Sequence, residues 1–243
     1  MKLHYIYHSG FALETDELIL LFDYFKDSNE EQAQAGIVHE QLLTSQKKMY
    51  VLSTHAHADH FNPTILAWRA TRPNIQYVFS QDILDLKLCK EEDAFFMEKG
   101  DTYEDDYLRI EAFGSTDAGI SFLVQLNNKL IFHAGDLNNW HWKDEADQQF
   151  IQEAESWYLR ELNDIYRKYK VIDLVLFPVD QRMKTDYYLG AEQFIKRIDT
   201  AYFAPMHFDE DYAGAQAFEA VAQENNTHFL KITQRGQSFD LDL

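Results

Sequence analysis

Four residues of the kinds that ligate metals stand within six positions of the sequence: His55, His57, Asp59 and His60. The run 49–54 before them is apolar and predicts a buried strand. Asn62 followed by Pro63 after them is typical of a helix start, with an N-cap residue and a proline in the first turn. Imidazole nitrogens and carboxylate oxygens suit zinc, iron and manganese. The cluster therefore predicts a metal site at a strand–helix junction, the alternative being a solvated polar turn.

Small residues separate these side chains and favour two centres. Ala56 and Ala58 allow the loop to curl, so that His55 and His57 face one centre. Asp59 and His60 can then turn to a second centre.

The pattern of apolar runs predicts an α/β layered sandwich. Strands are expected early and late in the chain, including a hairpin of 120–126 and 129–133 with a turn at Asn127 and Asn128. A long amphipathic helix is expected within 144–170. No proline- or glycine-rich linker or repeat interrupts the 243 residues, so we expect one domain over 1–243.

Charge and cysteine content restrict the partners and the compartment. The formal net charge is −19, from 22 basic and 41 acidic residues, which disfavours a phosphate backbone as ligand and favours a small-molecule substrate. One cysteine, Cys89, permits no internal disulfide and fits a reducing cytoplasm. No apolar stretch reaches the roughly 20 residues that a membrane span needs. We expect a cytoplasmic protein without a membrane segment; the oligomeric state is left open.

The H-x-H-x-D-H cluster after a strand resembles the motif of the metallo-β-lactamase superfamily, and further motifs follow in the same order. The resemblance implies an αββα sandwich with a binuclear metal site, in which His55 and His57 hold one metal. It implies that Asp59 and His60 hold the second. The resemblance of residues 132–136 (FHAGD) implies that Asp136 is the ligand shared by the two metals. The resemblance of residues 204–207 (APMH) implies that His207 is the last ligand. The alternatives are that Asp136 is only a turn residue and that His207 is a surface histidine at a strand end.

The opening motifs also resemble the simpler hydrolases of this superfamily. They lie at residues 7–11 (YHSGF) and 21–23 (LFD). On this basis we expect His8 near the metal ligands and Asp23 orienting a ligand histidine.

One expected histidine is missing, between the cluster and the Gly-Asp motif. Residues 113–122 contain none, and Ser115 stands about where it belongs. Asp117 is a candidate oxygen ligand in its place, and His141 is another candidate. If neither coordinates, the first site has two histidines and a shared aspartate, and it binds weakly, prefers a harder metal or stays empty.

The implied chemistry is hydrolysis with one or two divalent ions, zinc first, with manganese or iron as alternatives. A bound metal makes hydroxide available at neutral pH, and Asp59 or Asp136 can orient it and relay its proton. Arg182 is expected to hold a substrate anion, with Trp140 and His141 in an aromatic wall.

The first hypothesis for the function is a metal-dependent hydrolase of a small ester, lactone, amide or phosphodiester. A nuclease or phosphodiesterase of the same fold is the alternative, and a degenerate, non-catalytic metal-binding relative is another. A di-iron redox enzyme fits less well, because such proteins usually need a flavin partner domain.

Overall fold

The computed structural model describes residues 1–32 and 35–243, which form two compact units. Unit 1 comprises residues 1–98 and 232–243, and unit 2 comprises residues 99–231. The chain thus leaves unit 1 and returns to it with its last twelve residues. The expectation of one domain stays a prediction.

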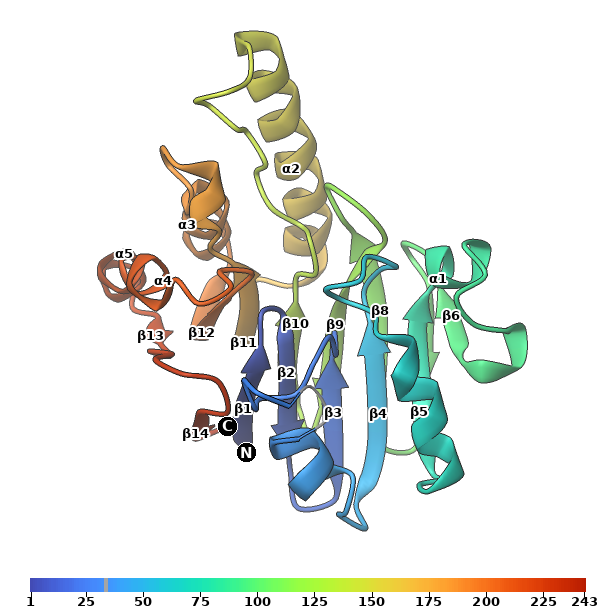
Figure 1. Cartoon of the computed structure of the whole chain (residues 1–243). Helices are drawn as coiled ribbons and strands as arrows, with labels where there is room; N and C mark the ends of the chain where they lie inside the picture. The colour runs from blue at the N-terminus through green and yellow to red at the C-terminus, as the bar shows by residue number, and fades with distance from the viewer. Residues whose placement is uncertain (33–34) are drawn as a thin grey trace. The chain divides into compact units, whose positions relative to one another are not determined.

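Unit 1 is built on a sheet of seven strands within the described residues, in the order β14-β1-β2-β3-β4-β5-β6. The strands are β1 (Lys2–Tyr7), β2 (Gly10–Glu14), β3 (Leu18–Phe22), β4 (Lys48–Ser53), β5 (Ile75–Ser80), β6 (Phe95–Met97) and β14 (Ser238–Asp240). Strands β3 to β6 run parallel to one another. The ends of β3 and β4 therefore meet at one edge, where the chain continues into Asp23 and into the histidine cluster. Both termini lie beside each other in this unit (Figure 1), and the Met1 amino group donates to the Leu241 carbonyl at 2.9 Å.

Short helices cover the sheet of unit 1. A 3₁₀ helix spans Pro63–Ala70, and the Asn62 side chain accepts from the Thr64 amide, as the capping pattern predicted. A π-helical turn spans Val38–Leu42, α1 spans Gln81–Asp85 and a 3₁₀ turn spans Glu91–Asp93. The core beneath them is rich in aromatic rings, with Tyr24 edge-to-face against Trp68 at 4.8 Å.

Unit 2 contains the second sheet, with seven strands in the order β13-β12-β11-β10-β9-β8-β7 over its described residues. The strands are β7 (Thr102–Glu104), β8 (Arg109–Gly114), β9 (Ile120–Leu126), β10 (Lys129–His133), β11 (Val171–Pro178), β12 (Asp199–Met206) and β13 (His228–Phe229). The predicted β9–β10 hairpin is confirmed, and Asn127 and Asn128 both have positive φ, as its two-residue turn requires. Strands β10, β11 and β12 are parallel, so the segments that follow them emerge at the same edge.

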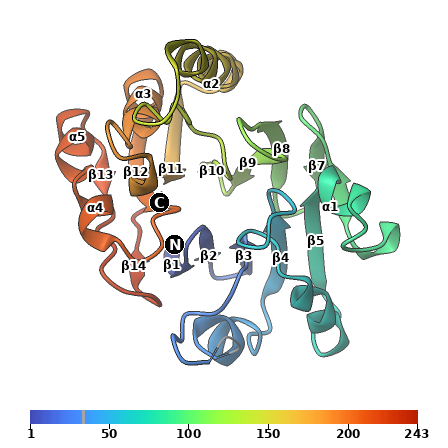
Figure 2. The same ribbon diagram turned by 45° about the horizontal axis from the view of Figure 1, so that its top comes forward.

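Helices pack against the sheet of unit 2 (Figure 2). They are α2 (Gln148–Lys168), α3 (Leu189–Arg197), α4 (Tyr212–Gln216) and α5 (Glu219–Glu224), with a 3₁₀ turn over Gln181–Met183. Asp147 caps α2 by accepting from the Phe150 amide, and the Tyr158 hydroxyl donates to the Gly190 carbonyl at 2.6 Å, tying α2 to α3. The expected mixed α/β class is confirmed. Among the described residues, no helix is both long and apolar enough to cross a membrane.

Candidate metal ligands in the two units

The histidine cluster of unit 1 forms a tight loop after β4. The His60 amide donates to the His57 carbonyl at 3.0 Å, and the Ala56 amide donates to the Asp82 carboxylate at 2.9 Å, which fixes the loop to α1. His55 Nε2 and His57 Nδ1 lie 2.9 Å apart. His55 is buried and His57 is exposed. The two ring nitrogens thus converge, as the alternation with small alanines predicted.

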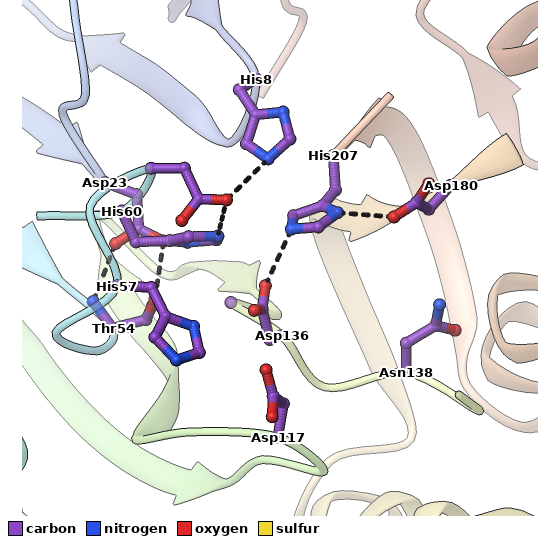
Figure 3. Close-up of polar contacts among 12 residues, drawn as sticks. His8, Asp23, Thr54, His57, His60, Asp117, Asp136, Asn138, Asp180 and His207 are labelled. Carbon is purple, nitrogen blue, oxygen red and sulfur yellow. Dashed lines mark hydrogen bonds and ion pairs between the residues drawn. The ribbon is translucent and has the colours of Figure 1, made fainter. Parts of the chain in front are cut away.

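Asp23 contacts the last histidine of the cluster (Figure 3). Its carboxylate accepts from His60 Nδ1 at 2.7 Å and from the Thr54 amide and hydroxyl at 2.8 and 2.7 Å. All three residues are fully buried. Because an ionised carboxylate only accepts, His60 carries its proton on Nδ1, and Nε2 keeps its lone pair for a metal. The expectation that Asp23 orients a ligand histidine agrees with this geometry.

His8 completes the donor set of unit 1. Its Nε2 lies 3.3 Å from Asp59 Oδ2, and His60 Nε2 lies 3.9 Å from the same oxygen. The donor atoms of His8, Asp59 and His60 all lie within 4.8 Å of one another. Two imidazoles and a carboxylate so close together have the composition of a transition-metal site.

Unit 2 holds a second donor pair at the edge where β10 and β12 end. His207 Nε2 lies 3.4 Å from Asp136 Oδ1, and both side chains are about 95% buried (Figure 3). His207 Nδ1 lies 3.0 Å from Asp180 Oδ2, which orients the ring. With Nδ1 protonated, a neutral imidazole turns its Nε2 lone pair toward a carboxylate, an arrangement that a cation between them stabilises.

Asp180 is held in its ionised form by two neighbours. Burial alone would raise its pKa, but hydrogen bonds from His207 and Arg182 outweigh burial and lower the pKa to about 2. Arg182 donates from Nε at 2.9 Å to Oδ1 and also donates from Nη2 to Oδ2. Arg182 Nη2 also lies 3.1 Å from His207 Nδ1, because both groups approach the same carboxylate oxygen.

Two of the expected substrate contacts have other partners in the structure. Arg182 directs its Nε and Nη2 donors to Asp180, so it positions that aspartate, and the expectation that it also holds a substrate anion stays a prediction. His141 is buried: its Nδ1 accepts from the Lys143 amide and its Nε2 lies 3.1 Å from the Asp186 carbonyl. Both ring nitrogens are thus used within unit 2, and the expectations that His141 binds substrate or replaces the missing ligand stay predictions.

The remaining expected residues lie close to Asp136 in the fold of unit 2. Trp140 donates from its indole nitrogen to the Asp136 carbonyl at 2.8 Å, and its ring contacts the His207 ring at 5.6 Å between centroids. Asp117 is exposed on the β8–β9 loop, with its carboxylate turned toward Asp136 in Figure 3. Its role as an oxygen ligand stays a prediction.

Known proteins resemble the chain over its whole length. No family model matches the sequence. A metal-dependent hydrolase of Desulforamulus reducens is 24% identical over 257 aligned positions, which cover 98% of each protein. A metallo-hydrolase of the archaeon Ignicoccus hospitalis superposes with a TM-score of 0.68 at 17% identity, covering 99% of each chain. A metallo-β-lactamase-fold protein of Bacillus subtilis superposes with a TM-score of 0.62 at 11% identity, covering 98% of each.

The chain is a metallo-β-lactamase-fold protein. The resemblance inferred from the motifs is thereby confirmed at the level of the fold. Similarity to proteins described as metal-dependent hydrolases extends over nearly all of its length.

Sequence reasoning missed two residues that support the donors of this metallo-β-lactamase-fold protein, Asp180 and Thr54. Both follow strands whose parallel neighbour also leads to a site residue. Pro178 pairs with Met206 in the β11–β12 register, so Asp180 and His207 emerge together. Phe22 pairs with Leu52 in the β3–β4 register, so Asp23 emerges beside Thr54. A polar residue within two positions of the ends of two adjacent parallel strands is the signal that could have found them.

Proposed function

We propose that this protein is a metal-dependent hydrolase of a small ester, lactone, amide or phosphodiester, using one or two divalent ions. One observation carries the proposal. In each unit a buried aspartate accepts from the Nδ1 of a histidine whose Nε2 approaches a second carboxylate: Asp23–His60 in unit 1 and Asp180–His207 in unit 2. Such carboxylate–histidine pairs are the usual supports of catalytic metals. The names of the relatives support the same activity.

We further propose that the donor set of unit 1 (His8, Asp59 and His60) and the donor pair of unit 2 (Asp136 and His207) are metal ligands. Zinc is favoured over manganese or iron. When bound, the metal supplies Lewis acidity that activates water and polarises the scissile carbonyl or phosphoryl group. Asp23 binds Nδ1 of His60, and Asp180 binds Nδ1 of His207. Each histidine therefore keeps its Nε2 lone pair available for a metal. Asp59 or Asp136 is proposed to orient the attacking water and to accept its proton.

The substrate is proposed to be a small molecule in the cytoplasm. Support comes from the net charge of −19, which disfavours nucleic acid, and from the single cysteine. A degenerate, non-catalytic relative is the second candidate, favoured by the absence of a histidine between residues 113 and 122.

Metal content separates the two candidates. The full-length protein is purified without chelator, and metals per chain are counted by mass spectrometry for the wild type, Asp117→Ala and the control Asp106→Ala, an exposed aspartate of the same unit. We expect two ions in the wild type and the control and one in Asp117→Ala. We also expect chelator-sensitive hydrolysis of p-nitrophenyl acetate or bis(p-nitrophenyl) phosphate.

Other outcomes change the proposal in defined ways. One ion in all three proteins indicates a mononuclear site without Asp117. Bound metal without hydrolysis of any ester, lactone, amide or phosphodiester supports the non-catalytic candidate. No metal in any of them refutes the metal-enzyme proposal.

A further inference from the structure

A cavity of about 420 Å³ lies in unit 2, between the loop that follows β10 and helix α2. Its size is in the range of small-molecule binding sites. The residues that matter for its chemistry are Thr116, Asn138, Trp140, Phe150, Trp157 and Arg160. None of them belongs to the donor sets described above.

One wall of the cavity is attached to the candidate metal ligands of the same unit. Trp140 lines the cavity, donates to the Asp136 carbonyl and contacts the His207 ring. Thr116 fixes the neighbouring backbone, because its hydroxyl donates to the Asn138 carbonyl at 2.6 Å and accepts from the Asn138 amide at 2.9 Å. A molecule in the cavity therefore lies one indole ring away from Asp136 and His207.

The opposite wall is an aromatic stripe on α2. Phe150, Ala154 and Trp157 follow at intervals of four and three residues, so they share one face of the helix. Phe150 is 47% exposed and Trp157 is 42% exposed, although most rings of their size are buried in this protein. Aromatic side chains on two sides of a cavity favour a flat apolar ligand, which can stack on them or meet their edges.

Arg160 adds a cation to this wall, one turn of α2 beyond Trp157. No ion pair or hydrogen bond of its guanidinium is found among residues 1–32 and 35–243. The other charged residue of the cavity, Glu153, accepts from the Gln149 amide group at 2.8 Å. A guanidinium at the end of an aromatic wall is suited to a carboxylate or phosphate carried by the ligand.

We infer that this cavity binds a planar apolar group bearing an anionic substituent, as the part of the substrate next to the hydrolysed bond. The inference deepens the proposed function and rests on it. It narrows the substrates to aryl compounds with an acidic group, held between Trp140 and Trp157 with the acid at Arg160.

Binding of two naphthalene probes tests the inference. Naphthalene-2-carboxylate and its neutral carboxamide are titrated calorimetrically into the full-length protein as purified with its metal. We expect Trp157→Ala to weaken both probes about tenfold, because half of the ring contact is lost. We expect Arg160→Gln to weaken the carboxylate about tenfold and to leave the carboxamide within about twofold, since only the former has a charge to pair.

Matched controls on the same helix distinguish the cavity from general effects on α2. Leu159→Ala removes an exposed apolar side chain, and Arg167→Gln removes an exposed cation, both outside the cavity. Both controls should bind the probes as the wild type does. Equal effects of Arg160→Gln on the two probes, or binding insensitive to Trp157→Ala, would overturn the inference.

Hydrolysis of p-nitrophenyl acetate, measured in parallel, separates the inference from the proposed function. Metal-dependent hydrolysis without naphthalene binding refutes the cavity assignment alone. Probe binding at the cavity without hydrolysis of any substrate refutes the hydrolase and, with it, the assignment of the ligand as substrate. Inhibition of hydrolysis by naphthalene-2-carboxylate, weakened in Arg160→Gln, supports both.

Discussion

The two units each orient a histidine with an aspartate, but they hold the aspartate by different means. In unit 1, Asp23 accepts from the Thr54 amide and hydroxyl as well as from His60, and the whole group is fully buried. In unit 2, Asp180 is paired with Arg182, whose side chain is 58% exposed. Neutral donors in a dry core are insensitive to salt, whereas a solvent-facing cation is screened by it. Salt should therefore affect how Asp180 orients His207 more than it affects how Asp23 orients His60.

Strained backbone at the site residues, by contrast, is common to both units. His8 and Asp23 in unit 1 have φ values of 56° and 44°, and His207 in unit 2 has a φ of 62°. Residues with side chains rarely adopt this left-handed conformation, and they retain it where surrounding contacts enforce it, often at functional sites. In both units, strained backbone positions therefore orient candidate metal ligands or the residues that support them.

The largest effect is expected for Asp23→Asn, which keeps the shape but places an amide against His60 Nδ1. The histidine must then change tautomer, so its Nε2 lone pair is lost and metal affinity falls about 10- to 100-fold. The lost charged hydrogen bonds lower the free energy of unfolding by about 1.5–3 kcal/mol. Metal titration and urea unfolding measure the two effects, with the exposed Asp16→Asn as control. Unchanged metal affinity would show that Asp23 does not set the tautomer of His60.

Asp180→Asn should have a somewhat smaller effect, because Arg182 can turn to solvent when its partner is lost. We expect metal affinity to fall about tenfold and the free energy of unfolding to fall by roughly 1–2 kcal/mol. Asp199→Asn, an exposed change in the same unit, is the control. A loss equal to that of Asp23→Asn would remove the contrast between the units.

The stability difference between the wild type and Asp180→Asn should depend on pH in the acid range. The folded pKa of Asp180 is about 2, below its ordinary value of 3.8. The ionised carboxylate therefore stabilises the folded protein fully at pH values above 3.8. This stabilisation is lost as the pH falls through about 2. Urea unfolding should show a constant difference between about pH 5 and 7 that shrinks below about pH 4. A difference that grows on acidification would contradict the depressed pKa.

The smallest effect is expected for Arg182→Gln. The Arg182 side chain is 58% exposed and its partner Asp180 is buried, so solvent screens the pair in part, and its loss should lower the free energy of unfolding by only about 1 kcal/mol. The metal affinity of the wild type should fall modestly between low and high salt, and that of the variant should not. The matching control, Thr54→Val in unit 1, should leave the salt dependence unchanged. If the metal affinity of Arg182→Gln still depended on salt, that dependence would come from charges other than Arg182.

Much of the local structure was predictable, because its causes are local. The strand before the histidine cluster, the Asn62 cap and the Asn127–Asn128 hairpin each depend on neighbouring residues, and the structure confirms them. The order of the motifs was sufficient to indicate the fold. The convergence of His55 and His57 followed from their spacing alone.

The tertiary structure decided which histidine each supporting aspartate orients. Asp23 reaches His60 across 37 positions, and Asp180 reaches His207 across 27, through the registers of parallel strands that no local pattern reveals. The partners of Arg182 and His141, which are Asp180 and the Asp186 carbonyl, were likewise not visible in composition or periodicity. The sequence by itself determined the kinds of donor and the strands that deliver them. Only folding determined their hydrogen-bond partners, because a side chain's partners depend on which distant strands become neighbours.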